Sequence, residues 1–132
     1  QYQIDSNFLP DGWRSYMARA VKDKFKKPVI NAGNYRDPKV VEKILESGDV
    51  DIVGMGRGLI ADPNWVKKVE NSEEDIIRKC ISCNVGCAGN RIGVNRPIRC
   101  TVNPAAMYSF WKRRIISEVS PHLFQTFRAR LV

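Results

Sequence analysis

The sequence has no long apolar run, few aromatic residues and a single histidine. Only 9% of its 132 residues are aromatic, and the histidine, His122, lies close to the carboxyl end. No stretch approaches the roughly 18 consecutive apolar residues that a membrane-spanning helix needs. The first residues also lack the charged-then-apolar pattern of a secretory signal. We therefore expect neither a membrane span nor a secreted protein.

Two common nucleotide-binding motifs are missing as well. The chain contains neither G-x-G-x-x-G nor G-x-x-x-x-G-K. These glycine patterns form the dinucleotide-binding turn of a Rossmann fold and the phosphate loop of an NTPase. Neither type of site is expected in this chain.

The positive charge of the chain is dispersed. Lysine and arginine exceed aspartate and glutamate by 22 to 14, which gives a net charge of +8. Apart from Lys22 to Lys27 and the trio Lys112, Arg113 and Arg114, the basic residues are spread over predicted helical faces. No basic run is interleaved with the aromatic residues on which single-stranded nucleic acid stacks. We therefore expect neither a nucleic acid nor a membrane as partner.

The four cysteines lie close together. They occupy residues 80–100 with the spacing C-x2-C-x3-C-x12-C, at Cys80, Cys83, Cys87 and Cys100. Three glycines interrupt this segment, and glycine permits the positive φ angles of a tight loop. The pattern indicates four ligands around one inorganic centre.

The cysteines alone leave several uses open. Two disulfides would suit a small secreted protein. Without a signal, and with metal-type spacing, a reducing cytoplasm is favoured instead. There, the thiolates suit either a structural zinc ion or an iron–sulfur cluster.

Apolar periodicity predicts alternating helices and strands. Helices are expected from about residue 12 to 24, capped by Asp11, and from Pro38 to near Gly48, capped by Asp37. A third is expected after Asp62-Pro63. Between them, residues 29–32 and 51–55 read as strands buried on both faces. This order is typical of β/α units in a parallel sheet or barrel, and two strands are too few for a stable sheet. The chain is therefore expected to be the last part of a larger α/β domain.

Both predicted strands end in glycine. Ala32-Gly33 follows the first, and Gly56-Arg57 follows the second. In a β/α barrel, the loops after the last two strands often bind a phosphate through backbone N–H groups. The alternative is that the glycines only make tight turns and that Arg57 is a solvated or ion-paired surface residue. The residues themselves leave both readings open.

Two longer segments carry a family resemblance. KPVINAGNYRDPKVVEKILESGDVDIVGMGRGLIADPNW, followed by CISCNVGCAGNRIGVNRPIRCTVNP, resembles the carboxyl-terminal part of the flavin barrel of NADH:flavin oxidoreductases in the old yellow enzyme superfamily. The similar branch is the iron–sulfur one, with 2,4-dienoyl-CoA reductase, enoate reductase and trimethylamine dehydrogenase. The resemblance covers about residues 10–106, and a GMGR motif and a four-cysteine loop follow each other in the family's order.

The resemblance implies a fold and a set of cofactors. Residues 1–79 would be the last β/α units of an FMN-binding (β/α)8 TIM barrel, 80–106 an iron–sulfur loop and 107–132 a divergent basic tail. The FMN phosphate would bind at Ala32, Gly33, Gly56 and Arg57. A 4Fe–4S cluster would be held by Cys80, Cys83, Cys87 and Cys100. Electrons would pass from NAD(P)H through FAD and the cluster to FMN, which reduces the activated C=C bond of an unsaturated acid or acyl-CoA.

The chain also departs from the family pattern. No catalytic proton donor is assigned, and His122 is expected on the surface. Residues 108–119 are expected to form a short basic helix in place of the family's glycine-rich FAD-binding segment. The chain is thus predicted to be a fragment of an FMN- and 4Fe–4S-dependent ene-reductase that is inactive by itself. The alternatives are a small zinc-stabilised binding module with a basic tail and a non-functional truncated remnant.

Overall fold

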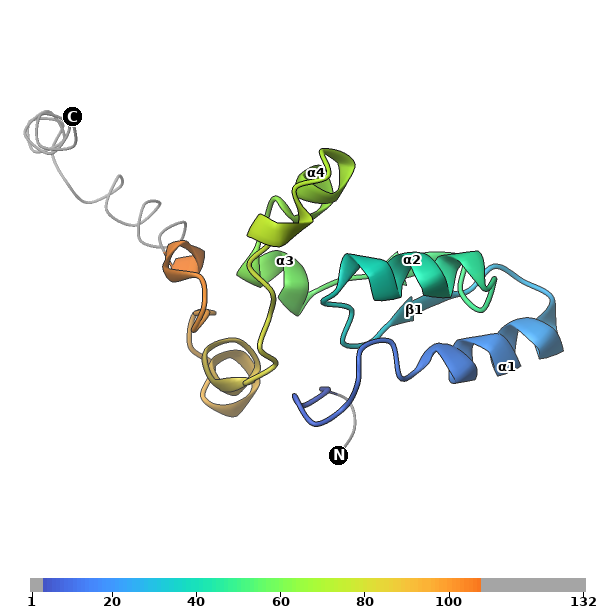
Figure 1. Ribbon diagram of the computed structural model, residues 1–132. Coiled ribbons are helices and arrows are strands. Elements are labelled where there is room, and N and C mark those ends of the chain that lie inside the picture. Colours follow the sequence, from blue (N-terminus) through green and yellow to red (C-terminus); the bar gives the residue numbers. More distant parts are fainter. Residues whose placement is uncertain (1–3, 108–132) are drawn as a thin grey trace, which may run out of the picture.

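The computed structural model of the protein describes residues 4–107 (Figure 1). The predicted basic helix over 108–119 and His122 lie outside this range. The elements follow one another as α1 (Ser15–Phe25), β1 (Ile30–Ala32), α2 (Pro38–Glu46), β2 (Ile52–Gly54), α3 (Arg57–Ala61), α4 (Trp65–Glu70), a 3-10 turn η1 (Glu74–Ile76), a π-helix η2 (Val85–Gly93) and a 3-10 turn η3 (Pro104–Met107). Within the described range, no helix is long and apolar enough to cross a membrane.

The sheet consists of two parallel strands with a helical crossover. Ile30 pairs with Ile52, and Ala32 pairs with Gly54. Helix α1 contacts β1 and α2 contacts β2, so the chain builds the β-α-β unit that parallel pairing requires. The predicted α/β class is confirmed, with strands slightly shorter than expected.

The strands are not buried on both faces. Ile30 is 68% exposed and Ile52 is 54% exposed. No other strand of the described range lies beside them, because the sheet contains β1 and β2 alone. The prediction of strands buried on both faces is therefore wrong for this chain.

Helix α2 begins where its sequence signal places it. The Asp37 side chain accepts a hydrogen bond from the Lys39 backbone N–H at 3.0 Å, and Pro38 occupies the first turn. A capping carboxylate satisfies a backbone donor that has no partner inside the helix. After the helix ends, Gly48 adopts a φ of +71°, a left-handed conformation that glycine accepts readily. The predicted start of this helix is confirmed.

Helix α1 begins later than predicted, and Asp11 is not its cap. The residue before the helix is Arg14, and no side chain caps it. Asp11 instead accepts hydrogen bonds from Arg36 Nε at 2.5 Å and from the Asp37 backbone N–H at 3.0 Å. The capping prediction is wrong because the carboxylate has charged and backbone partners on the segment before α2. Asp11 therefore ties the start of the chain to the second β/α unit.

The apolar core is small and lies around α2 and α4. Its buried members are Tyr35, Val41, Trp65 and Ile77. The Tyr35 hydroxyl donates to Asn31 Oδ1 at 2.6 Å. This hydrogen bond gives the buried tyrosine hydroxyl a partner, which offsets the cost of burying it. Val53 of β2 and Met55 pack against this core, so α2 and α4 are joined to the end of β2.

Candidate functional site

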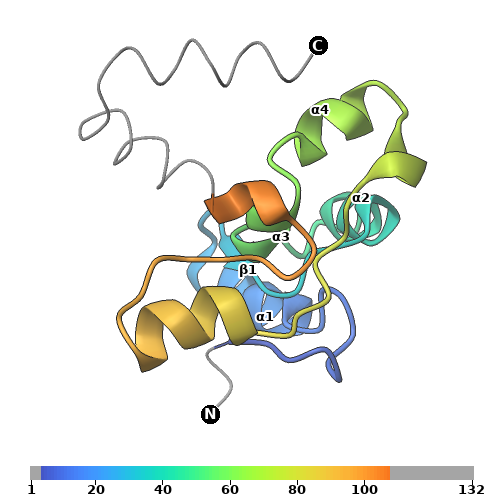
Figure 2. The same ribbon diagram turned by 90° about the vertical axis from the view of Figure 1, so that its left-hand side faces the viewer.

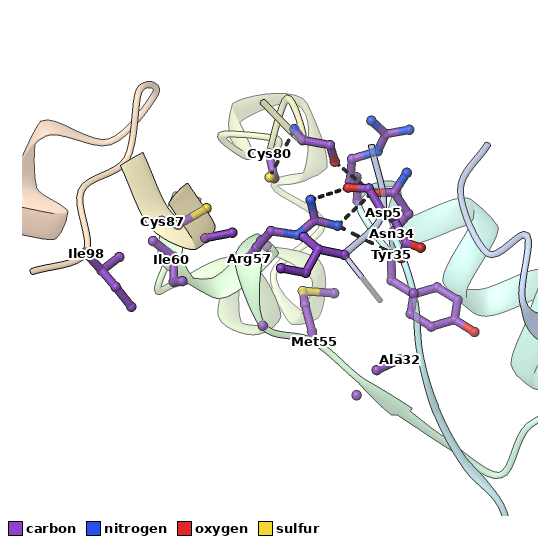
Figure 3. Close-up of a pocket in the computed structure, with 18 of the residues that line it drawn as sticks. Asp5, Ala32, Asn34, Tyr35, Met55, Arg57, Ile60, Cys80, Cys87 and Ile98 are labelled. Atoms are coloured by element: carbon purple, nitrogen blue, oxygen red, sulfur yellow. Dashed lines mark hydrogen bonds and ion pairs between the residues drawn. The ribbon is translucent and has the colours of Figure 1, made fainter. Parts of the chain in front are cut away.

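A pocket of about 340 Å³ opens where the two strands end (Figure 3). All four residues predicted to bind the FMN phosphate line it: Ala32, Gly33, Gly56 and Arg57. Cys80 and Cys87 line the same pocket, and both belong to the cysteine segment, residues 80–103. Strand ends and cysteine segment therefore meet at one place, as Figures 1 and 2 show for the yellow-to-orange part of the chain near α3.

The pocket lining is strongly positive. It contains the arginines Arg14, Arg36, Arg57 and Arg91, and among the described lining residues Asp5 is the one carboxylate. Arg14 forms an ion pair with Asp5 at 2.8 Å. The remaining charge favours an anionic ligand, because clustered like charges attract their counterion.

The two strand-end glycines differ in the room that they leave for a ligand beside the backbone. A Cβ built at Gly56 would meet no atom within 4 Å. A Cβ at Gly33 would approach the Arg14 side chain at 3.2 Å and Asp5 Oδ2 at 3.4 Å. The backbone next to Gly56 is therefore open, while the surroundings of Gly33 are occupied by the N-terminal segment. Gly56 fits the predicted phosphate contact better than Gly33.

The Arg57 guanidinium connects three segments of the chain. Its Nη1 donates to the Asp5 backbone oxygen and to Asn84 Oδ1, each at 2.5 Å. Its Nη2 donates to Asn34 Oδ1 at 3.3 Å. Figure 3 shows the side chain directed toward Asp5 and Asn34. Only 18% of this side chain is exposed, so Arg57 is not a solvated surface residue. Its Nη2 lies 4.0 Å from Asp5 Oδ2, which agrees with the alternative of an ion-paired arginine.

Asn34 is a second connecting residue, and the sequence reasoning missed it. Its Nδ2 donates to the backbone oxygens of Ser6 and Leu9, and its Oδ1 accepts from Ser82 Oγ at 2.7 Å. The residue is buried and has a φ of +49°, which asparagine tolerates better than most residues. The sequence feature that could have identified it is an asparagine directly after the glycine that follows the first strand.

The four cysteines face one small space. Cys80, Cys83, Cys87 and Cys100 all line a second cavity of about 10 Å³, and all four are free thiols. Within residues 4–107, no three histidine, cysteine, aspartate or glutamate side chains are arranged to hold a metal ion. The donor set fits iron or zinc by its chemistry, since thiolates bind both. This second cavity has room for about one water molecule.

Gly86 brings the remote Cys100 to the other three. The Arg99 backbone N–H donates to the Gly86 backbone oxygen at 2.7 Å. A Cβ at Gly86 would lie 2.7 Å from the Arg99 backbone oxygen, which is closer than any real contact. Only glycine therefore allows the segment before Cys100 to pack on η2. The sequence showed this glycine but not its partner.

Hydrogen bonds reach two of the thiols. The Thr101 hydroxyl lies 3.3 Å from Cys83 Sγ, and this bond, with smaller contributions from nearby backbone N–H groups, lowers the pKa of Cys83 below its ordinary value. The Ser82 backbone N–H donates to Cys80 Sγ at 3.3 Å. Thiolate rather than thiol is the metal ligand, so the lowered pKa of Cys83 favours ligation.

Cys87 lies on a helix whose geometry was not predicted. Element η2 is a π-helix, and its first i-to-i+5 bond runs from the Gly89 N–H to the Asn84 oxygen at 2.7 Å. Such wide turns are uncommon and often occur at functional sites. The sequence reasoning treated this stretch as irregular loop.

Asn103 attaches the end of the cysteine segment to the scaffold. It is 2% exposed, and its Nδ2 donates to the Ile60 backbone oxygen of α3 at 2.9 Å. Its Oδ1 accepts from the Ala105 backbone N–H at 3.1 Å. A buried amide with both ends satisfied positions the chain on either side of it.

A profile of the NADH:flavin oxidoreductase / NADH oxidase family matches residues 6–75. The chain is 52% identical over 103 residues to an NADH oxidase of Thermoanaerobacter brockii, an overlap that covers 78% of this chain and 16% of that protein. The chain therefore spans about a sixth of the length of this curated relative.

Two solved structures have a similar fold. The 6-hydroxypseudooxynicotine amine oxidase of Pseudomonas geniculata N1 superposes with a TM-score of 0.70 at 33% identity, over 77% of this chain and 15% of that one. A 2-naphthoyl-CoA reductase in complex with 2-naphthoyl-CoA superposes with a TM-score of 0.71 at 31% identity, over 76% and 15%. One relative is named for amine oxidation and the other for reduction of an acyl-CoA.

Proposed function

The chain belongs to the NADH:flavin oxidoreductase / NADH oxidase family, and we propose that it provides the FMN-phosphate pocket and the 4Fe–4S ligands of an enzyme that reduces activated C=C bonds. The observation that carries this proposal is the shared pocket. Both strand-end glycines, Arg57 and two of the four cysteines line one opening. A flavin and a cluster bound there would be neighbours, as electron transfer between them requires.

The pocket residues suit a phosphate monoester. Arg57 would supply the countercharge, and the open backbone at Gly56 would allow close approach of the anion. Arg14 and Arg36 add positive charge at the same opening, although Asp5 and Asp11 partly neutralise them. When bound, FMN supplies hydride transfer, while the protein orients it and sets the surrounding charge.

The cysteines would hold the cluster as four thiolates. Their chemistry suits 4Fe–4S as well as zinc, and the flavin pocket next to them favours the redox-active centre. The thiols would have to rearrange on ligation, because within residues 4–107 no three potential ligands are arranged to hold a metal ion. Coupling of loop conformation to metal binding is common in small metal sites.

The overall reaction would transfer two electrons from NAD(P)H to the substrate. The C=C bond takes up the equivalent of one hydride and one proton, and NAD(P)H becomes NAD(P)⁺. The substrate would be a small unsaturated acid or acyl-CoA, in line with the reductase named for 2-naphthoyl-CoA. The two β/α units described here would be the last two of the TIM barrel of a cytoplasmic enzyme. FAD and NAD(P)H would bind in other domains of that enzyme. No residue of this chain is proposed as the proton donor.

Two measurements on the full chain test the proposal. Anaerobic reconstitution should yield about four iron and four sulfide per chain, with broad visible absorption, and Cys100→Ser should lose most of it. FMN should bind about tenfold or more tightly than riboflavin, because one charge-assisted phosphate contact contributes roughly 1.5–3 kcal/mol. Arg57→Gln should remove this preference.

Arg19→Gln is the matched control. It removes the same charge from the exposed surface of α1, where Arg19 pairs with Asp23 and Asp49, and should leave the FMN preference intact. One zinc per chain without colour would support the zinc-stabilised binding module instead. A chain that takes up neither metal and binds both flavins equally would indicate the non-functional remnant.

A further inference from the structure

Arg57 belongs to both cavities of the site. It lines the strand-end pocket and also the small space that all four cysteines face. Its partner in the cysteine segment is Asn84, which directly follows Cys83. The residue proposed to meet the flavin phosphate is therefore hydrogen-bonded to the ligand loop itself.

The N–H donors of Arg57 are only partly used by its hydrogen bonds to the protein. Both N–H groups of Nη1 are used, one by the Asp5 backbone oxygen and one by Asn84 Oδ1. Nη2 makes one hydrogen bond, to Asn34, and within residues 4–107 no acceptor is recorded for Nε. A guanidinium has five N–H donors. Two donors thus make no hydrogen bond while the link to Asn84 is kept. Nη2, which carries one of them, also forms an ion pair with Asp5 Oδ2 at 4.0 Å, so an anion bound there would compete with Asp5.

The side-chain amide of Asn84 hydrogen-bonds to both Arg57 and the Asp5 backbone oxygen. Its φ of +59° is left-handed, a conformation that asparagine and aspartate adopt more readily than other side-chain-bearing residues. Its Oδ1 accepts from Arg57, and its Nδ2 donates to the same Asp5 backbone oxygen at 3.2 Å. The three residues form a closed set of hydrogen bonds.

From this arrangement, and resting on the proposed function, we propose that Asn84 is a positioning residue that couples FMN binding to cluster assembly. Ligation of Cys83 and Cys87 fixes the loop that carries Asn84, and Asn84 in turn fixes the Arg57 side chain. A preformed arginine loses less side-chain entropy when the phosphate binds. Each cofactor should therefore raise the affinity for the other, because such coupling is reciprocal.

The test compares FMN affinity with and without the cluster. The full chain is titrated anaerobically with FMN, before and after iron–sulfur reconstitution, and riboflavin is the probe that lacks the phosphate. We expect the cluster to tighten FMN binding about fivefold or more and to change riboflavin binding less than about twofold. Asn84→Gly, which tolerates the left-handed backbone, should bring the FMN ratio to within about twofold of one.

Asn95→Gly is the matched control. Asn95 lies in the same segment with a φ of +48°, and its Oδ1 accepts from Arg91 rather than from Arg57. This variant should keep the wild-type ratio. Equal ratios in Asn84→Gly and Asn95→Gly would overturn the proposal, and so would a wild-type ratio of one.

If Asn84→Gly fails to assemble a cluster, a second variant, Asn84→Asp, tests the coupling instead. Asn84→Asp keeps an oxygen for Arg57 and a residue suited to the left-handed backbone. Its carboxylate should weaken FMN binding in both forms by competing for the guanidinium, while the ratio between the forms persists. Loss of the ratio in Asn84→Asp would count against the coupling. Absence of a cluster, or of any FMN preference over riboflavin, in the wild type would refute the proposed function itself, and the coupling with it.

Discussion

The β/α scaffold and the cysteine segment are stabilised by different means. In the scaffold, residues 30–77, apolar side chains such as Val41, Val50 and Trp65 are buried. In the cysteine segment, residues 80–103, the buried side chains are those of Ser82 and Asn103, while the apolar Val85 and Ile92 are about 70% exposed. Hydrogen bonds to neighbouring segments order this part of the chain.

This difference shows why the two parts should respond differently to change. Apolar burial stabilises a region by itself, at roughly 25 cal/mol for each Å² removed from water. A loop without an apolar core gains little from burial, so metal ligation is the natural source of its order. The scaffold should therefore tolerate loss of the metal, and the cysteine segment should not.

The largest effect is expected for Trp65→Ala. Trp65 is 7% exposed in the apolar core, and its Nε1 donates to the Arg36 backbone oxygen at 3.4 Å. Truncating a buried tryptophan typically costs about 3–5 kcal/mol, a large share of a small domain's stability. Denaturant unfolding followed by far-UV circular dichroism measures the loss. The control Val66→Ala, at a 51% exposed neighbour on α4, should change the free energy of unfolding by less than about 0.5 kcal/mol.

Gly86→Ala should affect the cysteine segment alone. The new Cβ would lie 2.7 Å from the Arg99 backbone oxygen, so the segment that carries Cys100 must move. We expect a local cost of about 1–3 kcal/mol and reduced iron uptake. Amide hydrogen exchange should rise in residues 84–100 and stay unchanged in α2. Gly93→Ala, where a Cβ meets nothing within 4 Å, is the control, and equal iron uptake by both variants would contradict this prediction.

Asp62 joins the two regions and should give the boundary between them a pH dependence. Its carboxylate accepts from Lys68 Nζ at 2.6 Å and from the Arg78 backbone N–H at 2.9 Å, just before the cysteines. Burial alone would raise the pKa of Asp62, but the hydrogen bonds outweigh it and hold the pKa below its ordinary 3.8. Because the folded pKa is depressed, this stabilisation is complete above pH 3.8 and is lost as the pH falls through the folded value.

Asp62→Asn tests that dependence. At pH 7 the variant should be about 1–3 kcal/mol less stable, since Lys68 loses its countercharge and one of the two acceptor oxygens becomes an amide NH2. The difference from wild type should shrink as the pH falls below 3.8, where the unfolded chain binds the proton first, and should be smallest below the folded pKa, where the wild-type carboxyl is protonated in both states. Urea unfolding at a series of pH values measures both. A gap that stays constant with pH would show that the charge of Asp62 is not the cause.

The smallest effect is expected for Lys79→Gln at the other joint between the regions. Lys79 Nζ pairs with Asp37 Oδ2 at 2.7 Å, and both side chains are about one third exposed or more. This hydrogen bond is the main cause that lowers the pKa of Asp37. An exposed pair contributes about 0.2–1 kcal/mol, and 1 M salt should abolish the contribution. Lys67→Gln, at a lysine without an ion-pair partner in the described range, is the control. An Lys79→Gln effect that persists undiminished at 1 M salt would contradict the ion-pair explanation.

Much of the local structure could be predicted, because helix starts and strand order depend on residues that are close in sequence. Asp37-Pro38 starts α2, and the alternation of apolar runs with helical segments identifies two parallel β/α units. The predictions failed where the partner is distant in sequence. Asp11 stands where a cap would stand, yet its carboxylate bonds Arg36 and Asp37. No local sequence pattern indicates whether such a carboxylate caps the next helix or bonds a distant segment.

The same division holds for the candidate site. The sequence by itself determined the residue types: four cysteines with metal-type spacing, glycines at both strand ends and an arginine after the second. Only the tertiary structure decided that Arg57 reaches Asn84 and that Gly86 receives the Cys100 segment. The physical reason is that spacing limits what a segment can bind, whereas hydrogen-bond partners depend on which distant segments the fold brings within about 3 Å.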